Sequence, residues 1–353
     1  MVPIIMFKNL VNKFSNDIGI DLGTANTLVY LRGTGIVINE PSLVALNTKT
    51  NRIVAVGTLA KEMLGRTPVH IKSVQPIIDG VIADFEVTEE MLTYLITKTE
   101  KISKKFFSPR VVIGIPSGIT SVEHRAVYDA AKSAGAREVY IVEEPMAAAI
   151  GIGLPVHEPV GNMIVDIGGG TTDIAVISLS GIVQSKSIKV AGDRMNQDII
   201  AFIRNEHRML IGEKTAEELK INIGSAIDGT GRTYIIKGRD MATGLPKELL
   251  VSDYDIYTAL ERTVAQIVDA VREVLETTPP EIVSDVMRQG VYLVGGGALI
   301  NGLDTLMVNT FAIPVHIGHD PLSAVARGCG IILEDLVAHD ELLVHDYDIL
   351  PAL

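Results

Sequence analysis

Two short segments of this sequence combine acidic, glycine and hydroxyl residues in a pattern suited to binding phosphate. They are residues 21–27 (DLGTANT) and 166–172 (DIGGGTT), and each lies between two apolar stretches of strand length. Glycine lets the backbone approach a ligand closely, and successive N–H groups can then surround phosphate oxygens. An aspartate at a strand end supplies hard oxygen to Mg²⁺, usually through water. Further hydroxyl donors are Thr24, Thr27, Thr171 and Thr172. The pattern predicts two hairpins that clamp the β- and γ-phosphates of a nucleotide between two domains.

The two segments belong to an internal repeat. Residues 111–119 (VVIGIPSGI) and 291–299 (VYLVGGGAL) share an apolar pattern and a turn position. They begin 90 residues after Asp21 and 125 residues after Asp166, respectively. Chance similarity between glycine-rich turns is the alternative, but two matched pairs in the same order argue against it. The sequence therefore predicts two related halves, with the larger insertion in the second.

A third glycine run, at residues 295–297, supports the phosphate-binding interpretation. The sequence has neither a P-loop motif nor a Rossmann glycine motif, so those two nucleotide sites are excluded. Between the hairpins, Glu143 and Glu144 precede Pro145 at the predicted start of a helix. A carboxylate there could orient or deprotonate the water that attacks a γ-phosphate. The alternative is that it only interacts with the helix dipole; the neighbouring phosphate hairpins favour the catalytic role.

The elements that position these residues alternate between strands and helices, which predicts a mixed or parallel sheet covered by helices. The expected strands are two strand–turn–strand units at 17–31 and 163–179 and single strands at 110–115 and 139–142. The expected helices lie at 91–107 and 121–134, and a third opens at 145–150. Two later helices are expected to begin with capping boxes at 215–218 and 278–281, the second with proline at the first helical position.

The composition excludes several classes of protein. The 353 residues include 43 acidic and 31 basic residues, and the net charge of −12 argues against nucleic-acid binding, which needs clustered cations. Hydrophobic residues make up 47% of the chain, which excludes wholesale disorder. No apolar run reaches about 18 residues, and Lys8 and Lys13 interrupt the first apolar stretch, so neither a membrane span nor a secretory signal is expected. A single cysteine, Cys329, indicates a reducing compartment.

These segments, taken with several others, resemble the MreB family of bacterial actins. That family lies within the superfamily of actins, sugar kinases and heat-shock chaperone ATPases. The resemblance runs from residue 17 to about residue 330. The segments that carry it are 20–30 (IDLGTANTLVY), 39–42 (NEPS), 63–68 (MLGRTP), 79–85 (DGVIADF), 134–137 (AGAR), 143–151 (EEPMAAAIG), 165–172 (VDIGGGTT), 211–220 (IGEKTAEELK), 223–226 (IGSA) and 295–299 (GGGAL).

The resemblance implies an α/β, actin-like ATPase fold. It has two similar domains, each with a βββαβα-type core and a smaller inserted subdomain, and the nucleotide occupies the cleft between them. The expected subdomains are IA at 1–40, 75–153 and 323–353 (with an N-terminal amphipathic segment at 1–15), IB at 41–74, IIA at 154–189 and 254–322, and IIB at 190–253.

The resemblance also implies ATP or ADP and Mg²⁺ as ligands and assigns roles to residues, while GTP stays open as the nucleotide. The phosphates are expected to contact Gly23, Thr24, Ala25, Asn26, Gly168, Gly169 and Gly170. The adenosine is expected to contact Ala216, Glu217, Glu218, Leu219, Lys220, Gly295, Gly296, Gly297, Ala298 and Leu299. Asp21 and Asp166 would position Mg²⁺ through water. The implied catalytic residues are Glu144, then Glu143, with Asp166 and Thr171.

Three features depart from the family pattern. Ile78 precedes Asp79 and Gly80 where the family usually has a basic residue, and Asn196 stands where an acidic residue is usual. The chain also continues as an acidic tail at 339–353. None of these departures falls in the phosphate hairpins.

Two segments are candidates for contact with an anionic membrane. On a helical wheel of residues 3–14, one side carries apolar residues, among them Phe7, Leu10 and Phe14, and the other carries Lys8 and Lys13. A helix docked on the protein's own core is the alternative. The second segment sets Phe106 and Phe107 beside Lys104 and Lys105 before a strand, where the resemblance implies a membrane-inserting loop. Here the alternative is that one phenylalanine packs under the loop.

The implied function is that of a cytoskeletal protein that hydrolyses ATP slowly and polymerises with itself into membrane-associated, paired filaments. It would lie in the cytoplasm, on the inner face of the cytoplasmic membrane. It would act with the cell-wall elongation machinery to maintain rod shape, without binding nucleic acid. One alternative is a metabolic kinase of the same fold that phosphorylates a small molecule. A chaperone ATPase is less suited, because 353 residues leave no room for a substrate-binding domain.

Overall fold

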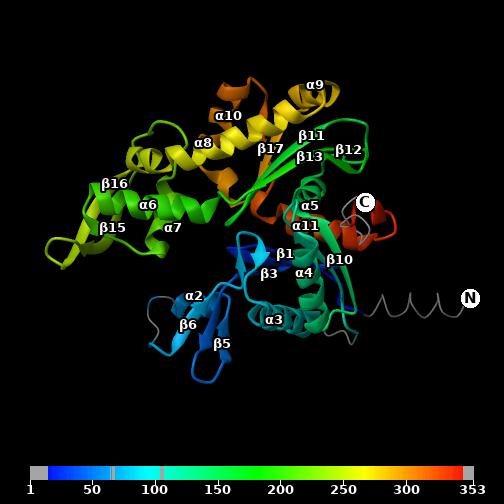
Figure 1. The fold of residues 1–353 in the computed structure, drawn as a ribbon, viewed down its shortest axis with the longest axis horizontal. Coiled ribbons are helices and arrows are strands. Elements are labelled where there is room, and N and C mark those ends of the chain that lie inside the picture. Colours follow the sequence, from blue (N-terminus) through cyan, green and yellow to red (C-terminus); the bar gives the residue numbers. More distant parts are fainter. Residues whose placement is uncertain (1–14, 64, 66–67, 104–106, 345–353) are drawn as a thin grey trace, which may run out of the picture. The chain divides into compact units, whose positions relative to one another are not determined.

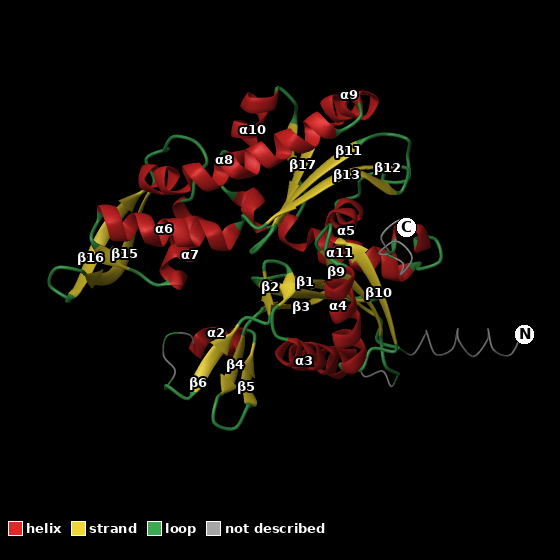
Figure 2. Ribbon diagram, in the orientation of Figure 1, coloured by secondary structure: helices red, strands yellow, loops and turns green. Residues whose placement is uncertain are grey.

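The computed structural model describes residues 15–63, 65, 68–103 and 107–344, which fold into two compact units (Figure 1). The first unit is formed by Met1–Glu158, Leu179–Gly181 and Ser323–Leu353, and the second by Pro159–Ser178 and Ile182–Leu322. The chain therefore leaves the first unit and returns to it for its last α-helix. Figure 2 shows that each unit mixes helices and strands, as the alternating sequence pattern predicted.

The first unit is built on a sheet whose strand order among the described residues is β10-β9-β1-β2-β3. Its strands are β1 (Ile18–Leu22), β2 (Asn26–Leu31), β3 (Gly35–Pro41), β9 (Arg110–Ile115) and β10 (Glu138–Glu143). β1 is antiparallel to β2 and parallel to β9, and β9 is parallel to β10. The strands predicted at 17–31, 110–115 and 139–142 are therefore confirmed.

Alternation along β1 sends its side chains to the two faces of this sheet. Ile18 and Ile20 are fully buried and pack with side chains of α3 (Phe85–Ser103) and α4 (Ser121–Ser133). Gly19 faces α11 (Ala324–Glu334), because a Cβ atom on it would lie 2.8 Å from the backbone N of Gly330. The same alternation places the Asp21 side chain on the α11 face.

The remaining strands of the first unit form two small sheets. The order β5-β4-β6 is found for β4 (Val44–Asn47), β5 (Arg52–Val56) and β6 (Ile71–Val74), against which α2 (Thr58–Met63) packs. Its small core contains Ala45, Ala55 and Ala60. A hairpin of β7 (Ile77–Ile78) and β8 (Val81–Ile82) then leads to α3.

Two helices of the first unit, α5 (Glu144–Gly151) and α11, pack against each other with their backbones in contact. A Cβ atom on Gly151 would lie 1.9 Å from the backbone O of Ala324. One on Gly328 would lie 1.7 Å from the backbone O of Ala147. No side chain fits in such a space, so the two glycines are what allows this close crossing.

The second unit contains a sheet with the order β13-β12-β11-β17-β18 among the described residues. Its strands are β11 (Asn162–Ile167), β12 (Thr172–Ser178), β13 (Gly181–Ile188), β17 (Val291–Val294) and β18 (Val315–Ile317). β11 is antiparallel to β12 and parallel to β17, and β17 is parallel to β18. The strand–turn–strand unit predicted at 163–179 is confirmed.

The register of these strands confirms the internal repeat residue by residue. In the first unit, Asp21 pairs with Gly114, and in the second unit Asp166 pairs with Val294. These are the equivalent positions in the sequence alignment that matches 111–119 with 291–299. Both units therefore place an aspartate at the same point of the same strand arrangement.

The other elements of the second unit surround this sheet and form a small sheet of their own. The helices are α6 (Gly192–Glu206), α7 (Glu213–Ile223), α8 (Asp253–Thr277), α9 (Pro280–Gln289) and α10 (Leu303–Phe311). The small sheet, in the order β14-β15-β16, consists of β14 (Met209–Leu210), β15 (Thr233–Asp240) and β16 (Pro246–Ser252). Short 3₁₀ helices are η1 (Gly296–Leu299), η2 (Pro321–Ser323) and η3 (Asp340–Leu342).

The helix predicted at 91–107 has the wrong bounds, because α3 spans Phe85–Ser103. It begins earlier because the side chain of Asp84 accepts a hydrogen bond from the backbone N of Val87 at 3.1 Å, as a residue at a helix N-cap does. Phe107 is not helical; it forms an isolated β-bridge with Ser15. The helices predicted at 121–134 and 145–150 are confirmed as α4 and α5.

The capping box predicted at 215–218 is wrong. α7 begins at Glu213 after Gly212 at the N-cap, so Thr215 lies inside the first turn. The sequence pattern is satisfied, but the helix starts three residues before the position that the pattern requires.

The capping box predicted at 278–281 is also wrong. Thr278 ends α8, and its hydroxyl donates to the backbone O of Val274 at 2.6 Å. α9 begins at Pro280 with Pro279 at its N-cap, so a proline does occupy the first helical position, one residue later than a box at Thr278 requires. Two capping boxes that the sequence pattern did not predict begin at Thr120, before α4, and at Ser252, before α8.

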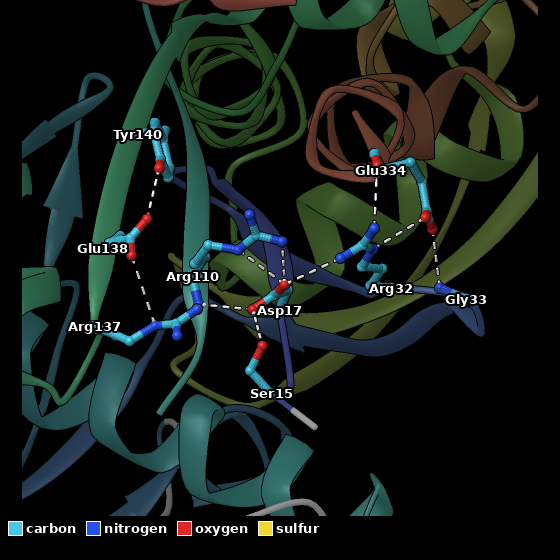
Figure 3. Close-up of polar contacts among 9 residues, drawn as sticks. All are labelled: Ser15, Asp17, Arg32, Gly33, Arg110, Arg137, Glu138, Tyr140 and Glu334. Carbon is cyan, nitrogen blue, oxygen red and sulfur yellow. Dashed lines mark hydrogen bonds and ion pairs between the residues drawn. The ribbon is translucent and has the colours of Figure 1, made fainter. Parts of the chain in front are cut away.

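A buried ion-pair network holds the start of β1 (Figure 3). The Asp17 carboxylate, fully buried, accepts hydrogen bonds from Arg110 Nη2 at 2.6 Å and from Ser15 Oγ at 2.6 Å. Arg32 Nη1 lies 3.4 Å from the same carboxylate, and Arg32 Nε donates to Glu334 at 3.2 Å. The network therefore links the residues just before β1 to the first residue of β9, to the residue just after β2 and to the last residue of α11.

Candidate functional site

The first predicted phosphate turn joins β1 to β2 at residues 23–25. Gly23 has no room for a side chain, because a Cβ atom would lie 2.7 Å from the backbone O of Asn26. Ser42 Oγ donates to the backbone O of Gly23 at 2.5 Å, and the Thr24 hydroxyl accepts from the backbone N of Gly80 at 3.0 Å. Two neighbouring segments therefore fix the turn, while Ala25 and Asn26 are exposed and free to meet a ligand.

Asp21 carries the first of the two predicted Mg²⁺-binding carboxylates. It lies at the end of β1, and burial raises the pKa of its carboxyl to about 7. A raised pKa means that the charged form is poorly compensated by its surroundings. A divalent cation beside the carboxylate, directly or through water, would supply the missing positive charge. The chemistry of this group therefore fits the predicted metal.

Glu143 and Glu144 lie at the junction of β10 and α5, in the same unit as Asp21. Burial raises the pKa of Glu143, and a hydrogen bond from Ser117 Oγ offsets part of that rise. Glu143 occupies the N-cap of α5 without making a side-chain capping hydrogen bond. Glu144 is the first residue of the helix and is 9% exposed.

Gly114 lies next to both Glu144 and Asp21. Gly114 is the register partner of Asp21, and a Cβ atom on it would lie 3.4 Å from Glu144 Cγ. Burial raises the pKa of the Cys329 thiol well above its ordinary value, and the charges of Asp21 and Glu144 raise it further. Both carboxylates therefore act on the same buried side chain, which places the predicted metal-binding and hydrolytic residues close together.

The second predicted phosphate turn joins β11 to β12 at residues 168–171. The backbone N of Gly168 donates to the backbone O of Thr171 at 2.9 Å and closes the turn. The first turn of α6 lies directly against it, since the backbone N of Asp193 donates to the O of Gly169 at 2.8 Å. Gly170 and Thr171 are buried, whereas Gly168 and Gly169 are partly exposed. Gly168 and Gly169 are therefore the residues best placed to meet a phosphate.

A polar cluster connects this turn to α7. Lys220 Nζ donates to the backbone O of Gly192 at 3.0 Å and to Glu217 Oε2 at 2.8 Å. Asn196 Nδ2 donates to the same Glu217 oxygen at 2.7 Å. Asn196, which departs from the acidic residue usual in the family, therefore has a structural role. Its amide group donates a hydrogen bond that a carboxylate could not donate.

The predicted adenosine-binding segment on α7 separates into two faces. Ala216 and Leu219 are fully buried in the core of the second unit, so their side chains support the helix rather than line a site. Glu217, Glu218 and Lys220 are partly exposed. Only these three have side chains that can reach a ligand.

The glycine run at 295–297 follows β17 and opens η1. Gly295 has φ 77°, and a Cβ atom on it would lie 2.4 Å from Asp166 Oδ1. Gly295 therefore leaves room for the second predicted Mg²⁺-binding carboxylate. Gly297 and Ala298 are buried, so they can offer a ligand only backbone groups, whereas Leu299 is 54% exposed.

Several residues that shape these turns were missed from the sequence. Ser42, Gly80, Gly114 and Ser117 contact predicted site residues in the first unit, and Gly192 does so in the second. The 39–42 segment was noted as part of the family resemblance, but nothing in it indicated a contact with Gly23. These contacts depend on pairings between distant segments.

Most of the predicted membrane-binding residues, Phe7, Leu10, Phe14 and Phe106, lie outside the described residues. Phe107 is described and is 43% exposed beside the start of β9. Among the residues that the structure describes, no helix is both long enough and apolar enough to cross a bilayer.

The matched sheets and the paired Asp–Gly turns define an actin-like α/β protein. Comparison with known proteins narrows this class: the MreB/Mbl protein family matches residues 15–341. The chain belongs to the MreB/Mbl family. It is 48% identical over 324 residues to cell shape-determining protein Mbl of Bacillus subtilis, covering 92% of this chain and 97% of the relative. It is 49% identical over 339 residues to MreB of Escherichia coli, covering 95% and 98%.

Solved structures agree with this assignment. MreB5 of Spiroplasma citri bound to ADP has a TM-score of 0.86 and 43% identity, and it covers 90% of this chain and 96% of its own. The same protein bound to AMPPNP has the same TM-score and identity and covers 92% and 97%. The MamK double helical filament, at 23% identity and a TM-score of 0.78, supports the fold alone.

Proposed function

We propose that this protein is an actin-like cytoskeletal ATPase that determines cell shape. The observation that carries the proposal is the matched register of the two Asp–Gly turns, Asp21 beside Gly114 and Asp166 beside Val294. Relatives at 48% and 49% identity are named cell shape-determining proteins, and a relative at 43% identity binds ADP and AMPPNP. The ligand is accordingly ATP or ADP.

In this proposal each of the two turns contacts one part of the bound ATP. The exposed backbone at Ala25 and Asn26 and at Gly168 and Gly169 binds phosphate oxygens. Asp21 and Asp166 are the residues that would hold Mg²⁺ through water, and the ion would supply positive charge to the phosphates. The Glu217–Lys220 face of α7 and the backbone of residues 295–299 bind the adenosine.

Hydrolysis in this proposal depends on Glu144. Its carboxylate lies beside the Asp21 position and orients the water that attacks the γ-phosphate. The partly buried Glu143 accepts a hydrogen bond from Ser117 and positions the strand end that precedes Glu144. Thr171 closes the turn of the second unit through its backbone O. Slow hydrolysis coupled to polymerisation is part of the proposal.

The proposal extends to filaments on the inner face of the cytoplasmic membrane, where the protein organises cell-wall elongation. Membrane binding would come from residues 1–14 and from Phe106 and Phe107, with lysines 8, 13, 104 and 105 meeting anionic lipid. Each subunit would bind weakly, and a filament would add the contacts by avidity.

Co-sedimentation tests the proposal. The protein should pellet with ATP and Mg²⁺, and more of it should pellet with vesicles that contain anionic lipid. Deleting residues 1–14 together with Phe106→Ala and Phe107→Ala should abolish lipid binding but leave filaments intact. Phe85→Ala, at another exposed phenylalanine of the same unit, should change neither. No pellet with ATP, Mg²⁺ and anionic lipid would contradict the filament, and phosphate transfer to an added small molecule would favour a metabolic kinase.

A further inference from the structure

The outer edge of β10 is covered by the last described residues of the chain. β10 ends the sheet order of the first unit, so within the part of the chain that the structure describes its outward backbone groups have no strand partner in that sheet. The backbone N of Val344 donates a hydrogen bond to the backbone O of Ile141 at 2.8 Å. The C-terminal segment therefore forms a main-chain contact with the strand edge, of the kind that an added strand forms.

Two adjacent leucines anchor this segment. Leu342 and Leu343 are each 6% exposed, and Val344 packs against the hydrophobic core of the first unit. Val337, a few residues earlier, is 90% exposed. Burial in this part of the chain is therefore specific to the residues that lie next to β10.

The segment is also held by a polar contact and has an extended backbone. Ser180 Oγ donates to Glu341 Oε1 at 2.7 Å. Leu343 has φ −86° and ψ 144°, a conformation that continues as a strand would. Main-chain bonding at a sheet edge, with side chains in apolar pockets, is how proteins bind extended peptides by strand addition.

We propose that the edge of β10 is a strand-addition site for an extended acidic peptide with two adjacent leucines, and that residues 341–344 occupy it in cis. The family match ends at residue 341, so the segment that fills the site lies almost entirely beyond it. A partner peptide of the same chemistry would bind only by displacing the chain's own segment. The site includes none of the residues proposed to bind nucleotide.

A peptide-binding measurement on the full-length chain tests this site. The probe is a fluorescent peptide of residues 338–353, followed by anisotropy without nucleotide. Wild type should bind it weakly, because a tethered segment competes at a millimolar effective concentration. The variant with Leu342→Asp and Leu343→Asp releases its own segment and should bind the probe at least tenfold more tightly. A probe with the same two substitutions should not bind, and Val337→Asp should behave as wild type.

A second variant removes only the backbone hydrogen bond. It keeps both buried leucines, so it is less prone to misfold than the first variant. Val344→Pro lacks the N–H that Ile141 accepts, and Leu343 already has the conformation favoured before proline. It should bind the wild-type probe about fivefold more tightly than wild type, the value of one hydrogen bond of ~1 kcal/mol. Equal binding of the probe to wild type and to both variants, with circular dichroism unchanged, would overturn the proposal.

Discussion

The Glu144 side chain lies against Gly114, so that a Cβ atom on residue 114 would come within 3.4 Å of Glu144 Cγ. The same Cβ would lie 2.9 Å from Val325 Cγ1 in α11. Because Gly114 also pairs with Asp21, a single glycine makes room where a metal-binding residue and a hydrolytic residue of the proposed site approach each other.

Gly114→Ala should therefore impair hydrolysis more than nucleotide binding. The added methyl group must push aside Val325 or Glu144, and overpacking of this kind costs about 1–3 kcal/mol in the free energy of unfolding. We expect kcat for ATP to fall at least tenfold while Kd for ATP changes less than threefold. Steady-state kinetics and nucleotide titration would measure the two, and an unchanged kcat would show that Glu144 is not positioned through this contact.

Glu144→Gln and Glu143→Gln form a matched pair. Both remove one charge with little change in shape, but only Glu144 is proposed to act on the attacking water. General-base residues contribute about 10²–10⁴-fold, so Glu144→Gln should lower kcat at least 100-fold and retain ATP binding. Glu143→Gln should lower kcat less than tenfold. The reverse order would assign hydrolysis to Glu143.

Asp21→Asn should change the pH dependence of stability. Since the folded-state pKa of Asp21 is about 7 and its ordinary value 3.8, the metal-free folded chain holds a proton that the unfolded chain loses between these values. Wild-type stability from this group is thus present at low pH and lost as the pH rises toward 7. The asparagine variant should unfold at a higher Tm than wild type at pH 8 without Mg²⁺ and ATP, by a smaller margin at pH 5, and at a lower Tm with both ligands added.

Asp17→Asn should destabilise the first unit at neutral pH. Burial alone would raise the pKa of Asp17, but hydrogen bonds from Arg110 and Ser15, with the Arg110 charge, hold it below its ordinary value. This stabilisation is present above the unfolded pKa and is lost as the pH falls through the folded one. Breaking such a buried pair costs about 3–5 kcal/mol, and the difference from wild type should shrink below pH 4.

The control for Asp17→Asn is Asp269→Asn, which breaks an exposed ion pair with Arg272 on α8. Surface pairs contribute about 0–1 kcal/mol, so urea unfolding should hardly change. Equal effects of the two substitutions would show that the Asp17 network does not stabilise the fold.

The sequence was informative where the chemistry is local. Each phosphate turn is a short segment between two apolar strands, so the repeat could be recognised from the sequence. The strand register, which pairs Asp21 with residue 114 and Asp166 with residue 294, came from the structure. The residues that secure these turns were not predictable. Gly80 is 56 residues from Thr24, and no local pattern indicates that their backbone and side chain meet.

The capping errors have a physical reason as well. A hydroxyl residue three positions before a carboxylate residue is a frequent sequence pattern. It forms a capping box only where a helix actually begins at that hydroxyl residue. Thr215 lies inside α7, and Thr278 bonds backward to Val274, whereas Thr120 and Ser252 stand where the chain enters a helix. The sequence also did not show which residues of the 216–220 segment are buried: Ala216 and Leu219 belong to the core.

The crossing of α5 and α11 determines which residues these positions can accept. At Gly151 and Gly328 even the methyl group of alanine would overlap a backbone carbonyl of the other helix. In a library that offers every amino acid at each of these two positions, only glycine should survive selection. The two positions should be as restricted in sequence as the phosphate turns. A selection for cell shape would thus recover two glycines that do not contact the nucleotide. Substitutions at these two positions would fail because of helix packing, not because of a role in binding or hydrolysis.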